Sequence, residues 1–304
     1  MTTPGVIRPI ERIKKMKTEP SPVTMMEPQG SSPPACSTML RSTLLLFFLA
    51  FPVYFMFLVF HEGGHALHTL AMGGPVSMFY VHPFPMAGYA LPPFDWENTW
   101  FHAAGAALVL PVSLLIFLLC WKRRSVSLLP LVMFFPWTAI GQGFVILMVM
   151  DDFNNIVQLT GISPIIFRVT GLMFVVAGIF LFVSLFPLLG LAPRDLRSLF
   201  VVPAAFFLWA LVGLIVGTLF VPGSPIDVVY GLGESILATA RSSLVLFVIF
   251  GVVLAATYVT LYRWLYPRLP AWLRMDTVQL AWKDMRIPAL LAAISVILGV
   301  IIIT

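Results

Sequence analysis

The chain has 304 residues, of which 60% are hydrophobic and 10% are charged, and its mean hydropathy is +0.98. Soluble domains carry roughly 25% charged residues, so this composition excludes an ordinary soluble enzyme and predicts an all-α polytopic membrane protein. The formal net charge is +5, but the basic residues are scattered between apolar segments, and we therefore expect no nucleic-acid partner. The two cysteines, Cys36 and Cys120, are too few for a disulfide framework and lack the spacing of a metal site.

Residues 1–40 are polar and proline-rich, with a basic cluster from Arg8 to Lys17. Because this segment shows no apolar periodicity, we expect a disordered cytoplasmic tail. The basic cluster either sets the topology of the chain or contacts anionic lipid. The apolar sequence begins too late for a secretory signal peptide, and no cleavage pattern of small residues precedes His61.

Apolar segments of about 20 residues predict about seven transmembrane helices. A three-helix core is expected within residues 41–161, and further transmembrane helices within 162–304. A cytoplasmic N-terminus places every lysine and arginine except Arg168 and Arg241 in the tail or in cytoplasmic loops, as the positive-inside rule requires. The predicted spans lie near 43–72, 99–121, 127–150, 165–190, 198–221, 243–266 and 287–304.

The first predicted span contains the sequence His61-Glu62-Gly63-Gly64-His65. Two histidines four residues apart are separated by about 40° around a helix axis, so both imidazoles can bind one Zn²⁺. The adjacent Glu62 can take a proton from the metal-bound water. Ionisable residues at membrane depth indicate a functional site, and the predicted topology places this one toward the non-cytoplasmic half. The alternative is a pair of core histidines bonded to each other or to the backbone, with Glu62 protonated.

The loop after this span, residues 73–98, has β-branched and aromatic residues between glycine and proline breaks. This pattern predicts short strands, or a β-hairpin-like membrane-associated loop. A strand edge beside a metal site could hold an extended peptide substrate by β-augmentation. The alternative is an ordinary interfacial loop with aromatic anchors.

A catalytic zinc ion commonly has three protein ligands and one open position. The third predicted span ends in Asp151-Asp152, at the same membrane depth as His61 and His65. Either aspartate can supply the third ligand, although acidic residues also simply terminate helices at the water interface. His68 shares the helix face of the two histidines, but three ligands from one straight helix converge poorly on a tetrahedral ion. We therefore favour an aspartate.

Outside these motifs the sequence offers fewer candidates. His102 lies near the start of the second predicted span, on the same side of the membrane as the histidine motif. It either orients substrate or bonds an oxyanion, or is an interfacial histidine without such a role. Residues 165–304 contain no second chemical motif, and 267–286 have the pattern of an interfacial amphipathic segment. The added spans either gate access to the site or bind a regulatory membrane partner.

The chain resembles the site-2 protease family of intramembrane zinc metalloproteases in three places. The segment 61–66 is similar to the family's zinc helix, 86–90 to its Gly-Gly-Tyr-Val element, and 152–156 with Leu159 and Gly161 to its Asp-Gly motif. Counting back four residues from Ile156, as in the family pattern, selects Asp152 over Asp151. The resemblance implies that His61, His65 and Asp152 bind zinc and that Glu62 is the catalytic base.

The resemblance also implies an activity, the hydrolysis of peptide bonds within or next to transmembrane segments of substrate proteins in the lipid bilayer. The sequence departs from the family at Phe153, where the family has glycine, and at Ala106 and Val109, where it often has proline and asparagine. The predicted orientation is opposite to that of several members. A non-proteolytic relative, acting as a pseudoenzyme or metal-binding regulator, is the main alternative. A metal transporter lacks support because no paired inverted repeats are evident. A di-iron oxygenase would need more than the five histidines present.

Overall fold

Helices make up most of the part of the chain that can be described. A computed structural model describes residues 35–76, 78–82, 87–91, 98–123, 125–192, 200–205, 207–209, 211–212 and 260–301. All of them belong to one compact unit, Pro34–Thr304. The predicted tail, residues 1–40, lies almost wholly outside the described residues.

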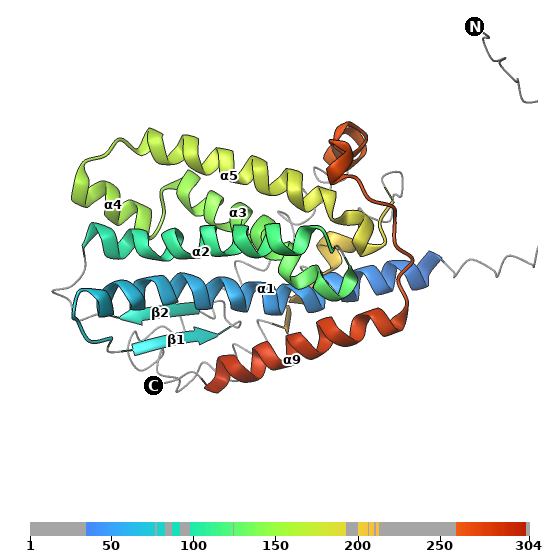
Figure 1. The fold of residues 1–304 in the computed structure, drawn as a ribbon, viewed down its shortest axis with the longest axis horizontal. Coiled ribbons are helices and arrows are strands. Elements are labelled where there is room, and N and C mark those ends of the chain that lie inside the picture. Colours follow the sequence, from blue (N-terminus) through green and yellow to red (C-terminus); the bar gives the residue numbers. More distant parts are fainter. Residues whose placement is uncertain are drawn as a thin grey trace, which may run out of the picture. The chain divides into compact units, whose positions relative to one another are not determined.

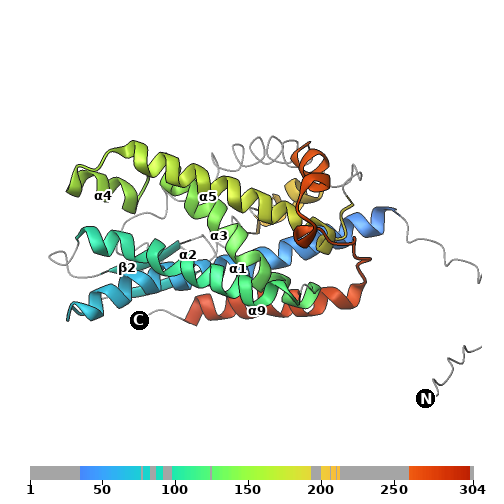
Figure 2. The ribbon, with the colours of Figure 1, turned by 45° about the horizontal axis from the view of Figure 1, so that its top comes forward.

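Four helices are long and apolar enough to cross a membrane, which marks the chain as a membrane protein. They are α1 (Ala35–Ala71), α2 (Thr99–Trp121), α3 (Leu129–Met148, extended at its start by the 3₁₀ helix η2, Val126–Leu128) and α5 (Pro164–Ser184). In Figures 1 and 2 the four helices lie roughly side by side, and the chain runs back and forth through them. The first four predicted spans are therefore confirmed as candidate membrane-spanning helices.

The remaining predicted spans are not settled by the described residues. Those near 198–221 and 243–266 lie largely outside them, and the last corresponds to α9 (Arg286–Ile301), which has 16 residues. A helix of that length is shorter than the roughly 20 residues that a bilayer requires. The number of seven spans therefore stays a prediction. Helix α9 packs along α1, where Ala292 joins a buried cluster with Ala50 and Phe51.

Short 3₁₀ helices occupy the segments next to α5 and before α9. Tyr262, fully buried, donates its hydroxyl hydrogen to the Leu191 carbonyl oxygen at 2.7 Å and thereby joins the two segments. Arg41 of α1 donates to the Leu280 carbonyl oxygen at 2.8 Å. These contacts attach the C-terminal part of the chain to the helices that precede it. The 3₁₀ helices are η3 (Phe186–Leu189), η4 (Tyr266–Arg268), η5 (Ala271–Leu273) and η6 (Trp282–Met285).

Two short strands follow α1 in the segment where the sequence favoured extended backbone. Strand β1 (Met78–His82) pairs antiparallel with β2 (Ala87–Leu91), with Tyr80 opposite Tyr89. Both strands contact α1, and they lie beside it in Figure 1. The connecting residues 83–86 and most of the loop that leads to α2 lie outside the described residues.

Helix α4 (Asp152–Thr160) is an element that the sequence analysis did not separate from the third span. Figure 1 shows it at the end of the bundle where α2 begins, and it contacts α2. Its buried residues, Phe153 and Ile156, pack with Ala106 of α2 and Ile146 of α3. Phe153 and Ile156 lie about one turn apart on the same face of α4. Their packing holds α4 across the end of the bundle.

Glycines allow the closest helix contacts. On α5, a methyl group at Gly171 would overlap the backbone nitrogen of Leu147 in α3, and one at Gly178 would lie 2.9 Å from the Ile140 nitrogen. On α1, a methyl group at Gly64 would overlap the carbonyl oxygen of Ala104 in α2. Small residues at such crossings let backbones approach closely in membrane proteins.

The two glycines of the histidine motif should differ in their tolerance to substitution. Gly64→Ala forces α1 and α2 apart, so we expect a loss of about 1–3 kcal/mol of stability, as for an overpacked core. Gly63→Ala is the matched control, because no atom lies within 4 Å of the added methyl group and alanine favours helix by up to about 1 kcal/mol. Thermal unfolding of the two variants in the same detergent measures the difference. Equal midpoints for Gly63→Ala and Gly64→Ala would contradict this account of the crossing.

Candidate metal centre

Helix α1 brings the two histidines of the motif together on one face. Its backbone is helical through residues 61–65, so His61 and His65 lie one turn apart. Their ring centroids are 4.9 Å apart, and the two Nε2 atoms are separated by 3.3 Å. The predicted convergence of the two imidazoles is therefore present in the described structure.

A strained turn between α3 and α4 positions the third side chain, that of Asp152. Val149, the residue after the last one of α3, has φ 53°, and Asp151 has φ 50°. Left-handed backbone is uncommon for residues other than glycine and costs of order 1–3 kcal/mol each. The turn makes Asp152 the first residue of α4, while the buried Phe153 ring, 5.6 Å from that of Phe167, anchors the helix.

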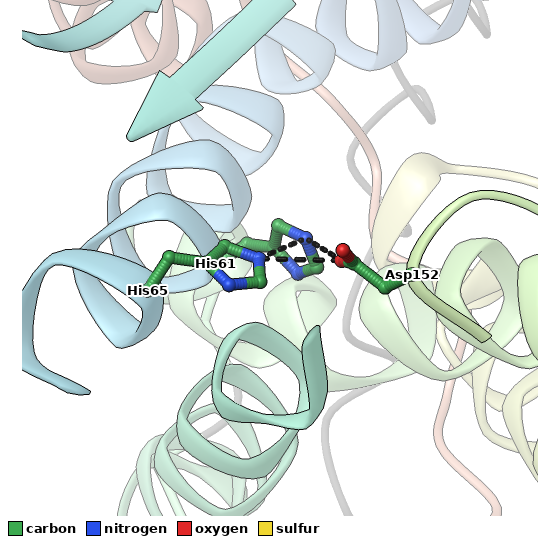
Figure 3. A group of neighbouring side chains, drawn as sticks. All are labelled: His61, His65 and Asp152. Atoms are coloured by element: carbon green, nitrogen blue, oxygen red, sulfur yellow. Dashed lines mark hydrogen bonds and ion pairs between the residues drawn. The ribbon is translucent and has the colours of Figure 1, made fainter. Parts of the chain in front are cut away.

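The three side chains form a nearly equilateral triangle, drawn in Figure 3. The Asp152 Oδ2 atom lies 3.4 Å from His61 Nε2 and 3.3 Å from His65 Nε2. A tetrahedral zinc ion with bonds of about 2.0–2.1 Å would have ligand atoms about 3.3–3.4 Å apart. The donor atoms therefore fit such an ion without rearrangement, and the three residues form a group that could hold a metal ion.

Helix α2 orients and accommodates the imidazoles from behind. The Phe101 carbonyl oxygen accepts a hydrogen bond from His65 Nδ1 at 2.7 Å, so Nε2 is the ring nitrogen left to bind a metal. A methyl group at Gly105 would lie 2.6 Å from His65 Nε2 and 2.8 Å from His61 Nδ1. Only glycine at position 105 leaves room for both rings.

The His61 ring is held mainly by packing. It stacks on Phe57, with ring centroids 5.5 Å apart and an interplanar angle of 18°. Its buried Nδ1 atom has no hydrogen-bond partner among the described residues. Metal-binding histidines usually make a hydrogen bond through the ring nitrogen that does not bind the metal, here called the outer contact. Among the described residues, His65 has such a contact and His61 does not.

The Asp152 carboxyl lies outside the candidate spans and is mostly buried, with 20% of its side chain exposed. Burial alone would raise the pKa of this carboxyl, but hydrogen bonds with His61 and His65 outweigh burial and hold the pKa well below its usual range. Asp152 is therefore ionised at neutral pH, the form in which a carboxylate binds a metal.

The structure distinguishes the candidate residues that the sequence left open. Asp152 belongs to the metal-binding group, whereas Asp151 is exposed at the turn and lies outside it. His68 is also outside the group, and its ring centroid lies 6.5 Å from that of Phe101. His102 lies beside the group, because its Nδ1 atom is 2.9 Å from Asp152 Oδ1.

Glu62 is 8% exposed and close enough to His65 to interact with it electrostatically. Sequence analysis missed the Phe101 carbonyl, the space at Gly105 and the bond between His102 and Asp152. The run of small residues at 103–107 predicts a close helix contact and could have indicated Gly105. No sequence signal identifies a backbone carbonyl as an imidazole partner.

Comparisons of the chain with protein-family models, with curated proteins and with solved structures find no match. The fold and the site therefore define the class of this protein by themselves. It is a membrane protein with a candidate metal centre of two histidines and one aspartate.

The adjacent aspartates provide a matched test of the centre. Asp152→Asn removes the charged donor, so we expect the affinity for Zn²⁺ to fall by more than the roughly 10- to 100-fold typical of an outer contact. Asp151→Asn should leave the affinity unchanged, because the exposed side chain lies outside the metal-binding group and asparagine tolerates positive φ. Metal content after dialysis against a zinc buffer measures both. Equal zinc retention by the two variants would exclude Asp152 as a ligand.

Proposed function

We propose that this protein is an intramembrane zinc metalloprotease, related to the site-2 proteases, that hydrolyses peptide bonds within or next to transmembrane segments of substrate proteins. One observation carries the proposal. The Nε2 atoms of His61 and His65 and the Oδ2 atom of Asp152 lie 3.3–3.4 Å from one another. A buried glutamate, Glu62, follows the first histidine on the same candidate membrane-spanning helix.

The donor set favours zinc among the common divalent ions. Imidazole nitrogen suits zinc, whereas magnesium and calcium prefer sites made entirely of oxygen. Three protein ligands leave one position for water or substrate, which is the pattern of catalytic rather than structural zinc sites. When bound, the zinc ion supplies Lewis-acid chemistry, since it polarises a carbonyl group and makes water more acidic.

Glu62 is the residue that we assign to proton transfer. It accepts a proton from the attacking water, whose oxygen adds to the carbonyl carbon of the scissile bond. The C–N bond then breaks, and Glu62 returns the proton to the leaving amine nitrogen, so that one water is consumed for each bond cut. The burial of Glu62 and His65 excludes bulk water from this exchange.

A transmembrane substrate must be unwound before it is cut, because the backbone groups of a helical peptide are hydrogen-bonded to each other. Strands β1 and β2 lie against α1, and their edges could pair with an unwound, extended segment. We propose that they form the membrane-associated β-hairpin expected from the sequence, and that residues 162–304 complete about seven spans. The basic residues support a cytoplasmic N-terminus and a site in the non-cytoplasmic half.

Glu62→Gln separates proteolysis from metal binding. Glutamine keeps the shape of the side chain but cannot accept the proton, so we expect cleavage to fall by about 10²- to 10⁴-fold while zinc content stays at the wild-type level. The assay measures cleavage of a set of transmembrane peptides by purified protein in detergent. Asp151→Asn serves as the active control. Removing zinc with a chelator should abolish cleavage by the wild-type protein, and adding zinc back should restore it.

The same assay tests the non-proteolytic alternative. A wild-type protein that holds zinc but cuts no peptide, in detergent or in bilayers, would contradict the protease proposal and favour a metal-binding regulator. A wild-type protein that holds no zinc when purified without chelators would contradict the metal centre itself. Cleavage that survives Glu62→Gln would assign the proton transfer to another group.

A further inference from the structure

We propose that His102 is a positioning residue that keeps Asp152 a one-oxygen metal ligand. The His102 Nδ1 atom lies 2.9 Å from Asp152 Oδ1, while Oδ2 of the same carboxylate faces the Nε2 atoms of His61 and His65. The inference rests on the metal centre of the proposed function, but it concerns coordination and does not require proteolysis.

The hydrogen bond between His102 and Asp152 has one possible direction. A carboxylate that binds a metal is ionised and accepts hydrogen bonds only, so the Nδ1 atom of His102 carries the hydrogen and donates it. His102 is 6% exposed, so bulk water does not compete for its Nδ1 hydrogen. A buried donor committed to Oδ1 leaves Oδ2 as the oxygen available to an ion.

His102 is the partner that fixes the Oδ1 atom of Asp152, since Oδ2 faces His61 and His65. Asp152 follows a turn with left-handed backbone at two positions, and it begins a helix of nine residues. The carboxylate is the most exposed of the three metal-binding side chains, at 20%, against 14% for His61 and 5% for His65. Without the His102 bond, the carboxylate could rotate and offer both oxygens.

The donor itself belongs to a rigid part of the fold. Phe101 and His102 are consecutive residues in the first turn of α2, so the outer contacts of His65 and Asp152 come from one short stretch of helix. The Asn98 side chain caps this turn by accepting hydrogen bonds from the nitrogens of Trp100 and Phe101, each at 2.9 Å. The cap thereby holds the two outer contacts in register.

A one-oxygen carboxylate has a consequence for the choice of metal. Two imidazoles and one carboxylate oxygen make three donors, which suits a four-coordinate ion such as Zn²⁺ or Co²⁺. A carboxylate binding through both oxygens would raise the coordination number toward the six to eight oxygens that calcium prefers. His102 therefore tunes the centre toward tetrahedral ions.

The test uses Co²⁺, whose visible absorption is strong in four-coordinate sites and weak at higher coordination number. We expect His102→Ala to lower Co²⁺ affinity by about 10- to 100-fold, as for other outer contacts, and to weaken the absorption of each bound ion. His102→Asn should restore both, since its amide nitrogen occupies nearly the position of the imidazole Nδ1 atom. His68→Ala is the control, because it removes a histidine that lies outside the metal-binding group.

Each outcome decides the proposal. Loss of affinity and absorption in His102→Ala, with recovery in His102→Asn, supports it. Wild-type affinity and spectrum in His102→Ala overturn it, and so does an equal loss in His102→Ala and His102→Asn, because a packing role alone would not be rescued by the donor. Wild-type protein that binds Co²⁺ but cuts no peptide overturns the protease assignment and leaves this inference intact.

Discussion

The close approach of α1 and α2 is the constraint on which the candidate metal centre depends. Gly64 lies against the Ala104 carbonyl, and Gly105 lies against the rings of His61 and His65. Any larger side chain at either glycine would separate the helices or displace the imidazoles. The contact that joins two helices therefore also shapes the space in which the ligands meet.

The same contact lets apolar helices carry polar groups. An unpaired polar atom in an apolar interior costs several kcal/mol, yet Glu62, His65 and His102 are all buried. The Phe101 carbonyl bonds His65, and Asp152 bonds His102. Burying polar residues within candidate membrane-spanning helices is costly, and these partners offset part of that cost.

Backbone strain in the turn between α3 and α4 is a second energetic cost of the site, besides the burial of polar groups. Val149 and Asp151 adopt left-handed backbone, which glycine would occupy without strain. The surrounding contacts maintain this conformation, since Phe153 and Ile156 pack into a cluster with α2 and α3. Strain of this kind gathers at functional sites, and here it places the carboxylate of Asp152 opposite the two histidines.

The sequence by itself determined the membrane class, the first four candidate spans and the pairing of His61 with His65. These features depend on apolar length and on the helical repeat, which are local properties of the chain. Asp152 was selected over Asp151 only through a family pattern, since spacing cannot say which of two neighbouring carboxylates faces a site 90 residues away. Only the tertiary structure decided which aspartate faces the histidines, and only it revealed the outer contacts from Phe101 and His102. The reason is physical: both depend on where α2 and α4 pack against α1 and α3, and that packing arises from side chains distant in sequence.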